Sequence, residues 1–243
     1  MVRVPTTVIP GQVLRGAWFS LVHGPARTSL AVSLLCLLAA LAALLKGSAR
    51  FPQLVLLGFS MAGIGMGRRS IGDDRLSARS VLLFQRPVSP MAHYGGRLLL
   101  STGLLALGAA VLAVAAVMVP APSPLAHAIG GFYWGCLLLI MSTTLSSVTG
   151  RFEGELVIAV VVVSALQVTL VQELGLAAAR DVLYCALVPV DAIFGTWNQW
   201  ASGTFAIPPA TAAHLLGYPT AWLALLAVRL RRADLGAADY HVN

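Results

Sequence analysis

Residues 98–119 read LLLSTGLLALGAAVLAVAAVMV, a run of 22 residues in which Ser101 and Thr102 are the only polar side chains. A helix needs about 20 apolar residues to cross roughly 30 Å of hydrocarbon. A helix that is apolar on every side over this length suits lipid better than a small soluble core. The run therefore predicts a membrane-spanning helix, and with it an all-α integral membrane protein.

The composition of the whole chain agrees with this prediction. Of the 243 residues, 58% are hydrophobic and 10% are charged, whereas soluble domains carry about 25% charged residues. The net charge is +7, but no soluble face combines Lys and Arg with aromatic residues, as nucleic-acid binding requires. Membrane lipid is thus an expected partner, and nucleic acid is not.

Further apolar runs outline a single transmembrane domain over residues 1–243. Leu14, Trp18 and Leu21 recur at helical spacing in residues 11–24, which predicts an amphipathic helix lying flat on the membrane. Six spanning helices are expected at about 28–45, 51–67, 98–119, 125–148, 156–176 and 210–230.

The segment Val182–Gly195 is apolar but contains Pro189 and Asp191. A helix of that length reaches about 21 Å, which is short of a crossing. We expect a re-entrant hairpin at the outer side, before the sixth span. Irregular backbone is tolerated there where protein or water covers it.

The distribution of basic residues predicts the orientation. With the N-terminus inside, thirteen arginines fall in cytoplasmic segments and three basic residues (Lys46, Arg50 and Arg180) fall outside. Positive charge is retained in the cytoplasm, so both termini are expected there. A seventh span at 182–195 would place Arg229, Arg231 and Arg232 outside.

The loop between the second and third spans has a distinctive order of elements. Asp74 to Gln85 can form a short helix, which must end before Pro87. Ser89 and Pro90 then start a new helix, with serine as the N-cap and proline at the first helical position. This helix continues into the membrane, so that movement of the short helix is transmitted to the third span.

This loop carries a resemblance to a known family. The sequence from Leu82 to Pro90, LLFQRPVSP, followed by Gly96-Arg97-Leu98, resembles the export-class (type-2) permease subunits of ATP-binding-cassette (ABC) transporters. Those subunits carry a Leu-Leu, Pro-Val-Ser and Gly-Lys/Arg series between their second and third spans. The family often has Glu and a Gly-Thr pair upstream, where this chain has Gly72-Asp73-Asp74-Arg75.

The resemblance implies a permease subunit of an ATP-driven exporter in a bacterial cytoplasmic membrane. Its partners are cytoplasmic ABC ATPase subunits, which bind ATP and Mg, and a second permease copy or a homologous permease chain. The expected ATPase-coupling residues are Asp73, Asp74, Arg75, Arg79, Arg86, Pro87 and Ser89. The one lysine, Lys46, lies in Leu45-Lys46-Gly47-Ser48, so the chain has no phosphate-binding loop of the G-x-x-x-x-G-K-[ST] type. No catalytic, cofactor or metal residue is predicted.

Polar and small residues inside the spans give weaker signals. Ser142, Thr143, Ser146 and Gln167 are candidates for a substrate path, and hydrogen bonding of the hydroxyls to helix carbonyls is the alternative. Gly63 and Gly67, like Gly131 and Gly135, have the G-x-x-x-G spacing of close helix contacts, which favours packing within the chain over a dimer face.

Other functions are compatible with six spans. An ion-driven transporter usually has ionisable groups near mid-membrane, and the expected spans contain none there. An intramembrane serine protease would pair Ser60 with His214, but the two lie at depths about 10 Å apart. A non-transporting membrane partner of an ATPase also fits. The sequence does not specify the cargo.

Overall fold

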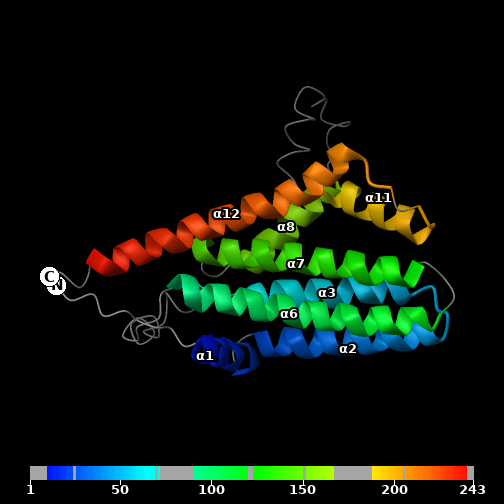
Figure 1. Ribbon diagram of the computed structural model, residues 1–243, viewed down its shortest axis with the longest axis horizontal. Coiled ribbons are helices and arrows are strands. Elements are labelled where there is room, and N and C mark those ends of the chain that lie inside the picture. The colour runs from blue at the N-terminus through cyan, green and yellow to red at the C-terminus, as the bar shows by residue number, and fades with distance from the viewer. Residues whose placement is uncertain are drawn as a thin grey trace.

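The computed structural model describes residues 10–23, 26–68, 71, 90–119, 123–149, 152–166, 188–204 and 206–239. Every regular element in these ranges is an α-helix, as expected, and no strand is present in them. The helices, shown in Figure 1, are α1 (Pro10–His23), α2 (Ala26–Leu45), α3 (Phe51–Gly67), α6 (Pro90–Val117), α7 (Ser123–Thr149), α8 (Glu153–Ala165), α11 (Val190–Ala201) and α12 (Pro209–Asp239).

Four of these helices, α2, α6, α7 and α12, are long and apolar enough to cross a membrane. This confirms the prediction of an integral membrane protein. The helices α3 and α8 are apolar but shorter, with 17 and 13 residues. At 1.5 Å per residue they reach about 26 Å and 20 Å.

The helix bounds agree with the sequence in places and differ in others. The helix α3 has the expected bounds, and α6 begins at Pro90. The helix α8 ends at Ala165, before the expected end at residue 176, and residues 167–187 lie outside the described part. Near this end, the Ser164 hydroxyl donates to the Val160 carbonyl and accepts the Val188 N–H, which joins α8 to the chain that leads into α11.

The segment expected as an outer hairpin also differs. Residues 182–187 lie outside the described part, and α11 continues past Gly195 to Ala201. The residues Ile193, Thr196 and Trp197 are buried, whereas Asn198 and Gln199 are exposed. The apolar run ends at Gly195, but the helix continues because the later residues are amphipathic and present their apolar side to the bundle.

The helix α7 is the centre of the bundle and contacts α3, α6, α8, α11 and α12. Its contact with α3 is close because glycines face each other. A Cβ atom added to Gly63 would collide with the Gly135 carbonyl oxygen, and one added to Gly67 would lie 2.8 Å from the Leu139 carbonyl oxygen. Both G-x-x-x-G pairs therefore serve contacts within the chain, as small residues do between membrane helices.

The turn between α2 and α3 is short and well defined. Gly47 adopts a positive φ of 63°, and the Ser48 N–H donates to the Ala43 carbonyl across it. This arrangement closes the carbonyl end of a helix in the Schellman manner. Pro52 occupies the first turn of α3, where a missing N–H costs nothing. The two helices are thus placed side by side.

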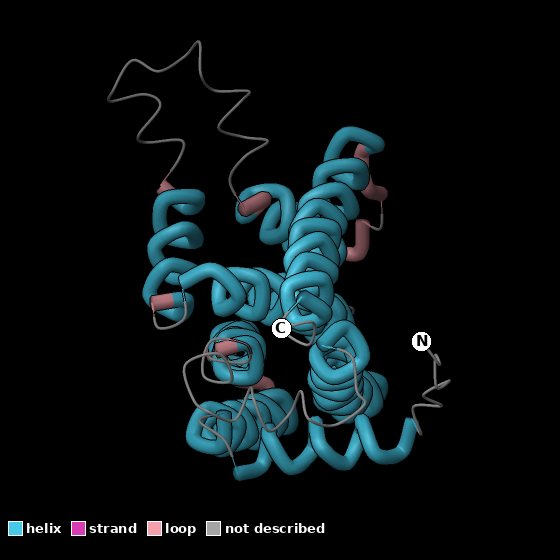
Figure 2. Tube along the Cα trace, turned by 90° about the vertical axis from the view of Figure 1, so that its left-hand side faces the viewer, coloured by secondary structure: helices cyan, strands magenta, loops and turns pink. Residues whose placement is uncertain are grey.

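The helix α1 lies across the bundle. In Figure 2 the helix nearest the N-terminus runs across the view, below helices that are seen end-on. Leu21 is fully buried against the core, whereas Leu14, Trp18 and Phe19 are exposed. An amphipathic helix in this position is suited to the membrane surface.

Candidate functional site

The arginines of the described helices mark one end of the bundle. Arg27 lies in the first turn of α2, Arg68 follows α3, and Arg229 and Arg231 lie in the last part of α12. These helix ends all lie on the left in Figure 1, and Lys46 and Arg50 lie in the turn at the opposite end. We call the first the arginine-rich end.

The predicted coupling loop joins two helices at this end. Its residues Asp73, Asp74, Arg75, Arg79, Arg86, Pro87 and Ser89 lie outside the described residues. The flanks are described. The helix α3 ends at Gly67 and α6 starts at Pro90, at the first helical position that the sequence predicts. From Pro90, α6 runs for 28 residues without a break, a length of about 42 Å. Its first turns therefore extend beyond a hydrocarbon layer of roughly 30 Å.

Ile71 is the described residue within the segment 69–89, and it is 2% exposed. Its backbone N–H donates to Ser146 Oγ on α7 at 3.1 Å. Its side chain belongs to a buried cluster with Tyr94, Leu226 and Leu230. This cluster, which we call the Ile71 cluster, joins the start of the loop to α6 and α12. Nothing in the sequence alone connected these residues.

The hydroxyls predicted to line a substrate path lie on α7, and their environments differ. Ser142 Oγ donates to the Ile64 carbonyl of α3 at 3.2 Å, and Ser146 Oγ accepts the Ile71 N–H. Neighbouring Thr144 and Ser147 donate to carbonyls within α7 itself, and the Thr144 hydroxyl also lies 3.5 Å from the Trp222 carbonyl of α12. These four hydroxyls therefore take part in helix contacts or in bonds within the helix. Gln167 lies outside the described residues.

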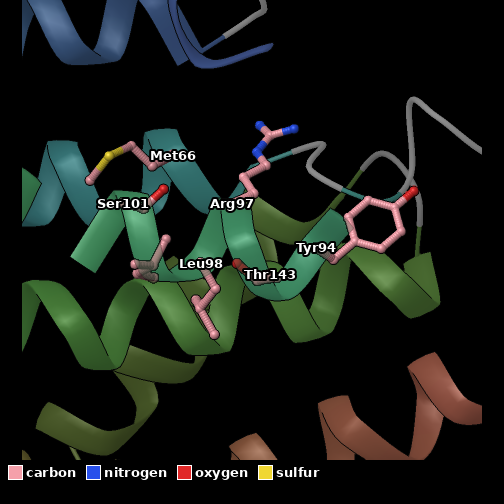
Figure 3. Close-up of a pocket in the computed structure, with 7 residues that line it drawn as sticks. Met66, Tyr94, Arg97, Leu98, Ser101 and Thr143 are labelled. Atoms are coloured by element: carbon pink, nitrogen blue, oxygen red, sulfur yellow. The ribbon is translucent and has the colours of Figure 1, made fainter. Parts of the chain in front are cut away.

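Thr143 differs from its neighbours because it lines a small pocket between α3, α6 and α7. The pocket is formed by Met66, Tyr94, Arg97, Leu98, Ser101, Leu139 and Thr143. Figure 3 shows the Arg97 side chain directed away from Leu98. Arg97 is 6% exposed and Ser101 is fully buried. The Arg97 side chain of the Gly-Arg motif is thus packed within the protein.

An ion pair connects α3 to α8 at the arginine-rich end. Arg68 Nη2 lies 3.3 Å from Glu155 Oε1, and both side chains are substantially exposed. Exposed pairs of this kind contribute about 0–1 kcal/mol. The pair joins residues 87 positions apart, so sequence spacing did not predict it.

Aromatic side chains join α11 to α7 at the opposite end. Trp197 lies 5.1 Å from His127, measured between ring centroids, and stacks on Phe194 at 5.6 Å. A Cβ atom at Gly130 would lie 2.7 Å from the Trp197 ring, so glycine allows the indole to pack against α7. The apolar face of α11 is therefore fixed against the centre of the bundle.

Two other candidates from the sequence can be placed. The Ser60 hydroxyl accepts a hydrogen bond from the Trp134 indole at 2.8 Å. His214 lies on α12 with its ring against Tyr218. No group of three or more His, Cys, Asp or Glu residues within the described ranges is placed to hold a metal ion.

Comparisons with known proteins do not assign the chain to a family. No protein-family model matches it, and no curated protein and no solved structure matches it.

Proposed function

We propose that this chain is the permease subunit of an ATP-driven exporter of the type-2 ABC class. The observation that carries the proposal is the loop sequence from Leu82 to Pro90, followed by Gly96-Arg97-Leu98. It lies between the second and third apolar helices, which is where the family has its Leu-Leu, Pro-Val-Ser and Gly-Lys/Arg series.

The arrangement of the helices supports the proposal. An amphipathic α1 precedes the apolar helices, and a short amphipathic α11 precedes the last long helix. In the proposed topology α2, α3, α6, α7, α8 and α12 make six crossings, with both termini in the cytoplasm. The segment that ends in α11 then forms a re-entrant element on the outer side. The shorter α3 and α8 need thinning of the bilayer or burial of their ends.

The charges of the described helices support the orientation. The arginine-rich end corresponds to the cytoplasm by the positive-inside rule. Gly67 and Pro90, which flank the coupling loop, lie at this end. A cytoplasmic ATPase would therefore find the loop, the first turns of α6 and the end of α12 on one side of the membrane.

The sequence indicates which functions this chain would supply and which its partner subunits would supply. The chain has no phosphate-binding loop, so ATP and Mg would be bound by separate ATPase subunits. Two permease chains, identical or homologous, would form the translocation path between them. The candidate path residues Ser142, Thr143, Ser146 and Gln167 stay a prediction. Cargo is left open, since drug, lipid, peptide and polysaccharide exporters share this scaffold.

Purification of the full chain in mild detergent tests the proposal. We expect an ABC ATPase to co-purify with it and the complex to hydrolyse ATP. Arg79→Glu is the matched comparison, because it reverses a charge in the loop and leaves the spans untouched. A chain that purifies without an ATPase from its native membrane, in lipid-preserving conditions, would contradict the proposal.

A further inference from the structure

The helix α12 is divided by a proline. Pro219 lies inside the helix and has no N–H to donate to the carbonyl four residues earlier, that of Leu215. The hydroxyl of Tyr133 on α7 donates to this same Leu215 carbonyl. The Leu215 carbonyl therefore accepts a hydrogen bond from a neighbouring helix. In this way α7 holds α12 at the point where the hydrogen-bond ladder of α12 is interrupted.

Beyond Pro219, α12 has few attachments to the bundle. Of the side chains described from Thr220 to Arg232, only Leu226 and Leu230 are buried. Both belong to the Ile71 cluster. Trp222 also packs partly against the bundle, and its carbonyl lies 3.5 Å from the Thr144 hydroxyl of α7. Beyond Trp222, the end of α12 nearest the arginine-rich end is held mainly by the Ile71 cluster.

The cluster contains residues from both sides of the coupling loop. Ile71 lies four positions after the end of α3, and Tyr94 lies four positions after the start of α6. Ile71 is also bound through its N–H to Ser146 of α7. The residue at the start of the loop and the first turns of α6 thus share the cluster in which Leu226 and Leu230 pack.

We infer that Ile71 is a positioning residue, which connects the coupling loop to the half of α12 that follows Pro219. The inference rests on the proposed function, in which the loop contacts the ATPase. Movement of the loop on ATP binding then moves this half of α12 relative to α7. Pro219 is the place at which α12 can bend, because it interrupts the hydrogen-bond ladder there. The outer half of α12 stays attached to α7 through Tyr133.

A distance between labels on α7 and α12 tests this coupling without knowledge of the cargo. Spin labels would be attached at Val148→Cys and Arg231→Cys, both exposed positions, after replacement of Cys36, Cys136 and Cys185. The labelled chain, diluted with unlabelled chain, would be assembled with its co-purifying ATPase in lipid nanodiscs. The distance would be measured by pulsed electron paramagnetic resonance, without nucleotide and with Mg-ATP and vanadate.

We expect the label distance to change on nucleotide trapping in the parent complex. Ile71→Ala should lose most of this change, and Ile71→Val, which keeps a branched side chain, should restore it. Ile193→Ala is the matched control, since it truncates an equally buried isoleucine on α11. The Ile193→Ala complex should retain the change in label distance on nucleotide trapping, although this substitution also removes core packing.

The outcomes separate the inference from the proposed function. An equal change in Ile71→Ala and in the parent would overturn the role of Ile71 and leave the permease assignment intact. The same conclusion follows if the parent complex hydrolyses ATP with no change in the label distance. Absence of any associated ATPase would overturn the proposed function, and the inference with it.

Discussion

The helices α7 and α12 are both long and apolar, yet the bundle buries them to very different extents. Within their most hydrophobic windows, 61% of the residues of α7 are buried and 11% of those of α12. Glycines and hydroxyls along α7 allow neighbouring helices to approach closely. The exposed face of α12 carries larger apolar side chains such as Leu216, Leu223 and Leu225.

This difference in burial indicates that α7 is fixed and that part of α12 is able to move. The helix α7 is bound on several sides by α3, α6, α8 and α11. The helix α12 is held by the Tyr133 hydrogen bond on one side of Pro219, and by Trp222 and the Ile71 cluster on the other. Segments with few buried contacts are the ones that open or shift at low cost. We therefore regard α7 as the frame and the end of α12 as the mobile element.

Membrane topology gives the largest expected effect, because each readout is all or none. Reporter fusions after Val148, at the end of α7, and after Leu235, near the end of α12, should both report the cytoplasm. A fusion within residues 120–124 should report the outside. An external readout after Leu235 would mean that the segment 182–195 spans the membrane, and the two helices would then end on opposite sides.

Charge reversal in the coupling loop should affect assembly and leave the frame intact. If Arg79 meets an acidic or polar groove on the ATPase, Arg79→Glu replaces attraction with repulsion. A reversed charge at such a contact costs several kcal/mol. We expect loss of the complex or uncoupled ATP hydrolysis, measured by co-purification and phosphate release, with normal insertion of the chain in the membrane.

Pro87→Ala is the matched change that leaves the loop charge unaltered. It removes the break expected between the predicted short helix of the loop and α6, and should preserve assembly while lowering transport per ATP hydrolysed. If Arg79→Glu and Pro87→Ala both assemble and transport like the parent, the loop is only a solvated connector with no role in coupling.

The contact between α3 and α7 should be the most sensitive part of the frame. An alanine at Gly63 would meet the Gly135 carbonyl, a backbone atom that cannot turn aside. Overpacking typically costs about 1–3 kcal/mol, and we expect the upper end here. For a chain of this size that lowers the melting temperature by about 6–12 °C. Gly217→Ala on α12 is the control, since nothing lies within 4 Å of its added Cβ. An equal loss of thermal stability in both variants would contradict the distinction between α7 as the frame and α12 as the mobile helix.

The hydrogen bond from Tyr133 should give a smaller effect. Tyr133→Phe leaves the Leu215 carbonyl without its donor, and an unsatisfied buried group costs about 1–3 kcal/mol. Pro219→Ala restores the backbone N–H that this carbonyl lacks. In a double-mutant cycle of thermal stability, Tyr133→Phe should therefore cost less in the Pro219→Ala background. Equal costs in both backgrounds would show that the hydroxyl does not replace the missing helix bond.

Local features of the fold were predictable from the sequence. Pro90 as the first helical residue of α6 follows from the properties of proline at a helix start. The bounds of α3 follow from an apolar run that begins after a turn. Close helix contact at the glycines of α3 and α7 was expected from their spacing, because small residues allow it, but that the two pairs face each other was not predicted.

Contacts between distant segments were not predictable in the same way. Neither the Ile71 cluster nor the pair between Arg68 and Glu155 has a signal in residue spacing, since each depends on how whole helices are placed. The continuation of α11 to Ala201 was missed because the apolar run ends at Gly195, whereas the helix continues through the polar residues Asn198 and Gln199. Tyr133 was missed because its role depends on Pro219 in another helix.

The measurement that tests the central claim most directly is ATP binding and hydrolysis by the purified chain, alone and with its co-purifying partner. A permease subunit without a phosphate-binding loop should neither bind nor hydrolyse ATP alone, and the complex should hydrolyse it. Tight ATP binding by the chain alone, or a native complex that contains no ATPase, would contradict the account.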